Sequence, residues 1–171
     1  FFVLATQNPI EQEGTYPLPE AQLDRFMFNV LLDYPSYEEE LEVVKKTTTI
    51  QDITLDTTMQ ASDILKYQEL IRKIPVPDNV LEYIVSLVLR TRPDLNNQND
   101  VTKYIDWGAG PRASQYMLLA AKCHAAIHGK YSPDIEDVRS VAKPVLRHRI
   151  VRNYKAEAEG VSLNEIIERL L

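Results

Sequence analysis

The feature that most constrains this 171-residue chain is its beginning, where a short apolar run leads to an amide side chain. Residues 3–5 are typical of a strand buried on both faces, and Asn8 stands directly before Pro9, which ends such a strand. Open α/β sheets present polar side chains at the carboxyl ends of their strands, where ligands bind. The pattern therefore predicts the last part of an α/β ligand-binding domain, with Asn8 as a candidate site residue.

A cation follows in the same region. Pro19 and Glu20 suit the start of a short helix, and Arg25 falls near the end of that helix. We predict a second strand in the β-favouring run 26–32. An arginine at this place can reach outward to a neighbouring molecule, or it can complement the helix dipole or pair with Asp24. From the spacing alone we favour the second interpretation, and the first stays open.

The pattern of the chain changes near Pro35. From Ser36 almost to the C-terminus the periodicity is helical, and capping boxes at Ser36 and Ser162 mark two helix starts. The predicted fold is mainly α: residues 1–35 are the remnant of an α/β core with one or two strands and a short helix, and residues 36–171 are an all-α helical bundle. Because one or two strands cannot form a stable sheet, we expect the chain to be truncated.

Hydrophobic periodicity predicts further helices between the two capping boxes. Ser62 and Asp78 are expected as N-caps of two of them. The helix after Asp78 is the most apolar and is expected at the centre of the bundle. A later alanine-rich helix should end at Gly129, and Pro144 should kink or split the helix that follows.

Composition argues against several classes of function. The net charge of −6 does not support a sequence-independent grip on nucleic acid phosphates. The single cysteine, Cys123, excludes an internal disulfide and is expected to be a buried structural thiol. His124 and His128 share a helix face without a third ligand, so no metal site is predicted. No apolar run is long enough to span a bilayer, and a reducing cytoplasmic setting is expected.

A second candidate site is the sequence Gly110-Pro111-Arg112, which leads into the alanine-rich helix. A cation in the first turn of a helix faces the positive end of the dipole, at a cost of about 0.3–1 kcal/mol unless an anion compensates. Backbone donors, the dipole and the guanidinium would together hold a phosphate. The alternative is an exposed arginine whose stem bends into water, and this segment alone does not decide between them.

A basic run, Arg147-His148-Arg149, follows a predicted helix and continues with Arg152 and Lys155. Such a run could touch phosphate or a partner. A charged run at a helix end is more often a solvated face that complements the dipole, and this is the interpretation that we favour.

The phosphate-binding loop G-x-x-x-x-G-K-[ST] does not occur in this sequence. The only Gly-Lys pair is Gly129-Lys130, and no apolar strand ends in the Asp-Glu pair that would hold magnesium. We therefore expect the chain to be inactive alone as an ATP hydrolase.

Three stretches resemble the MoxR-type AAA+ ATPases, which are relatives of the magnesium-chelatase ATPase subunit. They are L-A-T-Q-N-P at 4–9, E-G-T-Y-P-L-P-E-A-Q-L-D-R-F at 13–26 and G-P-R-A at 110–113. The resemblance extends over nearly the whole chain. It implies that residues 1–35 end an AAA+ nucleotide-binding core and that residues 36–171 are its helical lid domain.

The resemblance also implies a role for each candidate residue. Asn8 would be the sensor 1 residue, which orients the attacking water. Arg25 would be the arginine finger, which reaches across a subunit interface and stabilises the charge of phosphoryl transfer on a neighbour's ATP. Arg112 would be the nucleotide-binding sensor 2 residue. ATP and Mg²⁺ are the implied cofactors of the full-length protein, whose Walker A and Walker B segments would lie upstream of Phe1.

The implied assembly is a ring, often hexameric, that uses ATP-driven lid motion for chaperone-like remodelling or maturation of other proteins. Implied partners are a protein with a von Willebrand factor A domain and a client protein; neither nucleic acid binding nor membrane insertion is expected. Two rival hypotheses remain. One is a helical protein-interaction module in which Arg25 and Arg112 bind acidic surfaces, and the other is a helix-turn-helix DNA reader, against which the acidic composition argues.

Overall fold

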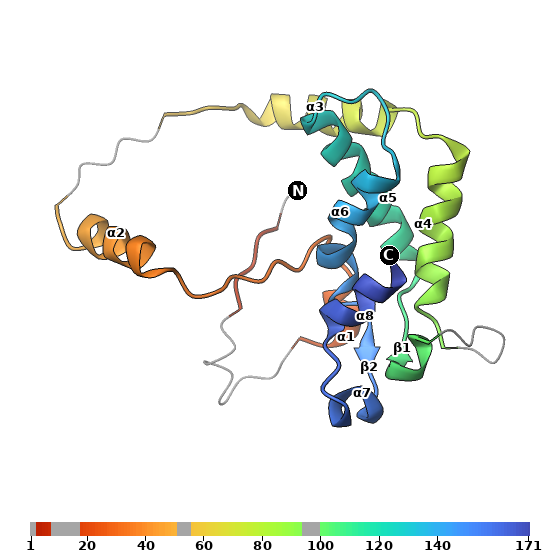
Figure 1. Ribbon diagram of the computed structural model, residues 1–171. Coiled ribbons are helices and arrows are strands. Elements are labelled where there is room, and N and C mark those ends of the chain that lie inside the picture. The colour runs from red at the N-terminus through yellow and green to blue at the C-terminus, as the bar shows by residue number, and fades with distance from the viewer. Residues whose placement is uncertain (1–2, 8–17, 51–55, 94–99) are drawn as a thin grey trace.

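The computed structural model describes residues 3–7, 18–50, 56–93 and 100–171, and these are mainly helical, as predicted (Figure 1). The elements are α1 (Glu20–Leu23), α2 (Tyr37–Thr47), α3 (Ala61–Lys73), α4 (Asp78–Arg90), the 3₁₀ turn η2 (Thr102–Tyr104), β1 (Ile105–Trp107), α5 (Pro111–Ile127), α6 (Ile135–Leu146), β2 (Val151–Arg152), α7 (Tyr154–Ala158) and α8 (Leu163–Leu170).

The alanine-rich helix α5 is the centre of the bundle. It packs most extensively against α6 and also contacts α3 and α4. Ala113 and Ala121 are fully buried, and such small side chains let neighbouring helices approach closely. The prediction that α4 is central is therefore wrong: α4 buries Leu87 on one face but leaves Val85 and Leu89 about half exposed on the other.

Local capping fixes several helix boundaries. Ser36 and Ser162 both form the predicted capping boxes, with their backbone N–H groups donating to Glu39 and Glu165 at 2.8 Å. Gly129 follows α5 with a φ of 72°, which a glycine adopts without strain, and helix α5 ends there as predicted.

Two predicted N-caps are displaced by a short distance. Helix α3 begins before Ser62, because Gln60 and Asp63 form a capping box instead. Asp78 is the first residue of α4 rather than its cap, and Pro77 takes the cap position. Acidic side chains favour the first helical turn as well as the cap, so the sequence pattern does not separate the two positions.

Residues 26–32 do not form the predicted strand, and residues 3–7 form none either. A strand exists only beside a hydrogen-bonded neighbour, and among the described residues neither segment has one. Instead, Asn29 N donates to Pro144 O at 2.9 Å, so this segment is tied to the end of α6. A side chain with high β-propensity stays exposed there, Val30 at 70%.

Pro144 does not split α6, and the alternative of a kink stays a prediction. The helix continues to Leu146 because Pro144 lies in the last turn, where the ring removes a single backbone hydrogen bond. Its carbonyl remains free of the helix ladder and accepts the bond from Asn29.

The strands β1 and β2 pair antiparallel, with Ile105 opposite Arg152 and Trp107 opposite Val151. The sequence patterns predict neither these strands nor α7. Three residues and two residues are too few to show a period, and the pairing joins segments that are far apart in the chain.

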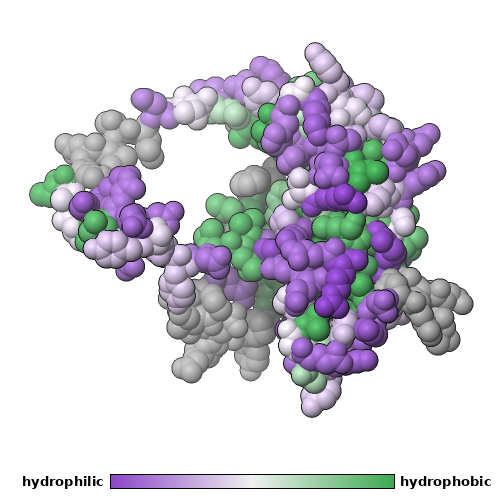
Figure 2. All heavy atoms as spheres, viewed as in Figure 1, coloured by the Kyte–Doolittle hydropathy of each residue, from purple (hydrophilic) through white to green (hydrophobic). Residues whose placement is uncertain are grey.

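Helix α2 stands apart from the bundle in Figure 1, and none of its residues is buried. Local contacts support it: the Thr47 and Thr48 hydroxyls donate to carbonyls one turn back, and Lys46 pairs with Glu42 at 2.5 Å. Figure 2 shows a group of hydrophobic side chains between α2 and the bundle and further hydrophobic patches on a face of the bundle that is otherwise mostly hydrophilic. The division at residues 35 and 36 stays a prediction.

A buried carboxylate, Asp137, joins the end of α5 to the start of α6. His124 Nδ1 lies 2.7 Å from Asp137 Oδ1, Lys130 Nζ lies 3.1 Å from Oδ2, and Asp134 N donates to Oδ2 at 2.8 Å. Burial acts to raise the pKa of Asp137, but the hydrogen bonds from Asp134, His124 and Lys130 outweigh it and lower the pKa to about 2.

Replacing Asp137 with asparagine is expected to destabilise the chain by roughly 2 kcal/mol at pH 7. A depressed carboxylate pKa stabilises the fold above the unfolded pKa, so this contribution should fade between about pH 4 and pH 2. Urea unfolding at several pH values measures it. The matched variant Glu136→Gln, at a 72% exposed side chain in the same helical turn, should change stability little. An Asp137→Asn deficit that is equal at pH 7 and pH 2.5 would contradict the assignment.

The other singled-out side chains have structural places in α5. Cys123 is a half-buried free thiol, and burial raises its pKa, which lowers its reactivity at neutral pH. His124 serves Asp137, and the described residues contain no cluster of three His, Cys, Asp or Glu side chains placed to bind a metal. Within the same residues no helix has the length and apolarity needed to cross a membrane.

Candidate functional site

Arg25 lies two residues beyond the end of α1, in a turn whose backbone is fixed. Arg25 N donates to Gln22 O at 3.1 Å, and the Tyr116 hydroxyl donates to Arg25 O at 3.0 Å. The side chain is exposed, and in the described part of the chain no hydrogen bond or ion pair engages its guanidinium. The Arg25 backbone is therefore fixed by hydrogen bonds, while its guanidinium is exposed to solvent.

Arg112 lies in the first turn of α5, as predicted, and the loop before it is held against the end of α4. Ala109 N donates to Thr91 Oγ1 at 2.9 Å, and Arg92 Nε donates to Ala109 O at 2.9 Å. A Cβ on Gly108 would lie 2.4 Å from Thr91 O, so only glycine permits this close approach. These contacts fix where α5 starts and hence where Arg112 stands.

The carboxylate of Asp24 connects the candidate residue Arg112 with a second arginine, Arg149. Arg112 Nη1 donates to Asp24 Oδ2, and Arg149 Nε donates to Asp24 Oδ1 at 3.0 Å. The Arg112 side chain is 44% exposed, whereas that of Arg149 is 1% exposed. Asp24 thus pairs with Arg112 and Arg149 rather than with its neighbour Arg25, and Arg112 does not simply bend into water.

Arg149 holds the segment after α1 through its backbone. Its Nη2 donates to Asp24 O at 2.8 Å and to Phe26 O at 2.5 Å, and its Nη1 donates to Met27 O at 3.4 Å and to a carbonyl of α6. The guanidinium also lies 5.2 Å from the centre of the Tyr116 ring. Burial lowers the pKa of Arg149 and Asp24 partly offsets this, but an arginine remains protonated at neutral pH.

The neighbours of Arg149 contact the same segment, and we call Arg147, His148 and Arg149 the basic clamp. His148 Nε2 donates to Phe26 O at 3.0 Å, and Arg147 Nη1 donates to Asn29 O at 3.2 Å. Burial and then the charge of Arg149 lower the pKa of His148, so this ring is neutral at pH 7. The prediction of a solvated face is therefore wrong, because a distant segment returns to this helix end and supplies carbonyl acceptors.

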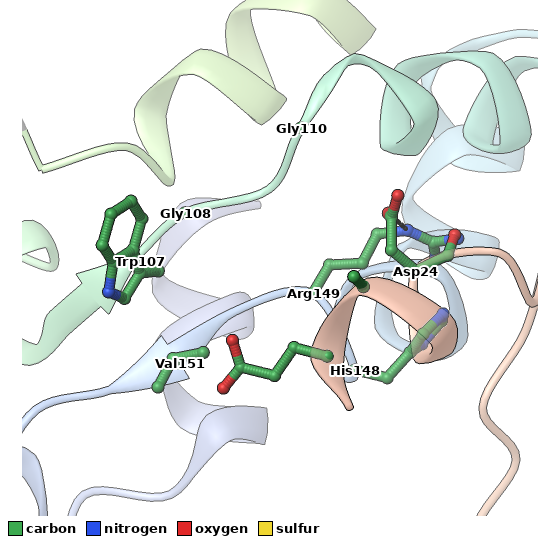
Figure 3. A pocket seen from close by; sticks show the side chains of 9 residues that line it. Asp24, Trp107, Gly108, Gly110, His148, Arg149 and Val151 are labelled. Atoms are coloured by element: carbon green, nitrogen blue, oxygen red, sulfur yellow. Dashed lines mark hydrogen bonds and ion pairs between the residues drawn. The ribbon is translucent and has the colours of Figure 1, made fainter. Parts of the chain in front are cut away.

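A pocket of about 250 Å³ opens beside the Asp24–Arg149 pair. Helix α1 borders it on one side, and the loop at Gly108 and Gly110 with the strand residue Trp107 borders it on another. Figure 3 shows Asp24 and Arg149 pointing toward each other across from Trp107, whose side chain is 68% exposed. The pocket thus has a charged wall and an aromatic wall.

Two of the three predicted site residues, Arg25 and Arg112, fall in the described part of the chain, and Asn8 lies outside it. The structure brings Arg25 and Arg112 to the same corner of the molecule through Asp24. Sequence reasoning missed Asp24 and Arg149 as site residues. The only local signal was that Asp24 stands directly before Arg25, within a stretch already singled out.

Comparison of the sequence with protein families gives two matches. The family described as the AAA lid domain matches residues 97–170, and the ATPase family associated with various cellular activities (AAA) matches residues 1–28. The basic clamp and Asp24 therefore connect a segment of AAA core sequence to a lid domain. The fold and the site thus define the class of the chain: it is the end of an AAA-type core followed by an AAA lid domain.

Comparison with individual proteins gives a more specific family than the two family matches do. The chain is 40% identical to the chaperone MoxR1 of Mycobacterium tuberculosis and 36% identical to the protein YeaC of Bacillus subtilis, over 100% of this chain and 45% and 51% of those proteins. The crystal structure of a proposed ATPase from Cytophaga hutchinsonii superposes with a TM-score of 0.84 and 40% identity, covering 99% of this chain and 52% of that one. The chain belongs to the MoxR-type AAA+ family, and it spans about half the length of the curated relatives it matches.

Proposed function

We propose that the full-length protein hydrolyses ATP with the help of Mg²⁺ and uses the energy for chaperone-like remodelling of other proteins. The observation that carries this proposal is the placement of Arg112 in the first turn of α5, joined through Asp24 to the turn that bears Arg25. Backbone donors, the helix dipole and a guanidinium meet there, which is the combination that binds phosphate.

Each of the three candidate residues would have a separate role in binding or hydrolysing the triphosphate. Arg112 would bind phosphate within its own subunit and report nucleotide state to the lid domain, residues 36–171. Arg25 would act on the ATP of a neighbouring subunit, which suits an exposed guanidinium on a held backbone. Asn8 would orient the attacking water from the core, residues 1–35. The triphosphate and Mg²⁺ would be held by Walker A and Walker B segments outside this chain, so the chain alone would not hydrolyse ATP.

A finger that acts in trans requires an assembly, and a ring, most simply a hexamer, supplies one such interface for each nucleotide. The relative named as a chaperone supports a role on other proteins. A protein with a von Willebrand factor A domain and a client would be the partners, in the cytoplasm. If Arg25 and Arg112 only bound acidic surfaces of partners, neither the binding nor the hydrolysis of ATP would depend on them.

The test is the variant Arg112→Ala in the full-length protein. A charge-assisted hydrogen bond to phosphate is worth about 1.5–3 kcal/mol, so the affinity for ATP should fall by roughly ten- to a hundredfold. Calorimetric titration with a non-hydrolysable ATP analogue measures this. The control is Arg139→Ala, at a 45% exposed arginine on α6. Unchanged affinity together with unchanged turnover would count against the proposed site.

A further inference from the structure

Asp24 has two guanidinium partners that differ sharply in burial. The pair with Arg149 is enclosed, since the Arg149 side chain is 1% exposed. The same guanidinium also donates to the carbonyl oxygens of Asp24 and of Val145 on α6. The pair with Arg112 is open to solvent, since that side chain is 44% exposed. One carboxylate therefore has a permanent partner and an exchangeable one.

The open pair is the weaker of the two. Ion pairs at exposed sites contribute little because water screens them and long side chains lose freedom in forming them. If Arg112 leaves, Asp24 keeps the charge of Arg149, so its carboxylate is not left unpaired. A phosphate, by contrast, offers a guanidinium several charged oxygens and two parallel hydrogen bonds.

We propose that Asp24 competes with nucleotide phosphate for Arg112, so that nucleotide binding transfers this guanidinium from Asp24 to the phosphate. This inference rests on the proposed function and adds a switching residue to it. Because Asp24 directly precedes Arg25, the transfer releases one tie on the turn that carries the finger. Nucleotide binding in one subunit thereby changes the constraint on the residue that serves the next subunit. By linkage, the state of that turn also changes the affinity for nucleotide.

The variant Asp24→Asn in the full-length protein tests the competition. It removes the competing charge but keeps an oxygen for Arg149, which retains its carbonyl partners, so the fold should persist. The affinity for a non-hydrolysable ATP analogue should rise by roughly two- to fivefold, the range expected for an exposed pair. The matched control is Asp106→Asn, an exposed aspartate on β1 to which no ion pair is assigned in the described residues, and it should change affinity little.

A double variant separates competition from a general charge effect. In the Arg112→Ala background, Asp24→Asn should leave affinity unchanged, because the competed group is gone. Equal tightening in both backgrounds, no tightening in either, or weaker binding by Asp24→Asn alone would overturn the inference. These outcomes differ from failure of the proposed function, in which Arg112→Ala itself leaves affinity unchanged.

Hydrogen exchange on the wild-type protein gives a test that does not depend on a variant folding. When the ATP analogue saturates the protein, the backbone amides of residues 20–26 should exchange faster, because Arg112 no longer ties Asp24 to α5. Amides in the first turn of α5 should exchange more slowly. Unchanged or slower exchange over residues 20–26 would overturn the transfer.

Discussion

Replacing Arg25 with alanine in the full-length protein is expected to leave ATP binding nearly intact and to reduce turnover by about a thousandfold or more. The reason is that the guanidinium makes no hydrogen bond or ion pair within the described part of its own chain, while its backbone is held by Tyr116. Removing this exposed side chain should therefore leave the packing of the chain unchanged. It should remove only the positive charge that would contact the phosphate of a neighbouring subunit's ATP. Steady-state turnover together with calorimetric binding measures the two effects separately.

Mixing variants shows whether Arg25 acts in trans. Subunits that carry Arg25→Ala but an intact Walker B segment should regain activity when mixed with Walker-B-defective subunits, which supply Arg25 to the intact sites. The matched control is Arg169→Ala, at an exposed arginine on α8, which should keep normal turnover. Normal turnover in the Arg25→Ala protein would rule out the finger role.

Replacing Arg149 with methionine is expected to release residues 24–29 from the lid. The substitution removes a buried charge partner of Asp24 and leaves carbonyls without donors, which together should cost about 3 kcal/mol. Opening of this segment should become roughly a hundredfold more frequent. Hydrogen exchange at Asn29 N, which donates to Pro144 O at 2.9 Å, reports this opening directly.

Two comparisons make the Arg149 result specific. Arg149→Lys keeps a positive charge for Asp24 but cannot reach several carbonyls at once, so it should restore only part of the protection. Arg139→Met removes a 45% exposed arginine on α6, the helix that ends shortly before Arg149, and should leave exchange at Asn29 unchanged. Equal protection in the wild type and Arg149→Met would mean that the basic clamp does not hold the segment.

Features decided by a few neighbouring residues were predictable from the sequence. The capping boxes at Ser36 and Ser162 and the end of α5 at Gly129 depend on local backbone donors and on one positive φ, and all three are confirmed. The strand expected at 26–32 failed for a different reason. β-propensity describes how side chains suit a sheet, but the strand itself depends on a partner that the local sequence does not contain.

The site was predictable in part for the same reason. The position of Arg112 in a first helical turn follows from Gly110 and Pro111 and is confirmed. The burial of Arg149 was not predictable, because it depends on a contact with a segment about 120 positions earlier in the chain. A cationic run has the same local pattern whether it meets water or carbonyl groups. The catalytic roles of Asn8 and Arg25 stay predictions.

The basic clamp recognises the segment after α1 almost entirely by its main chain. Every residue type offers a carbonyl oxygen, so substitutions at Phe26 or Met27 would leave the acceptors of Arg149 in place. The hydrogen bonds from Arg149 are therefore insensitive to which side chains occupy those positions, although Met27 also packs against the hydrophobic core. Natural variants can therefore change these side chains without removing the main-chain acceptors, and packing constrains the choice of residue at Met27.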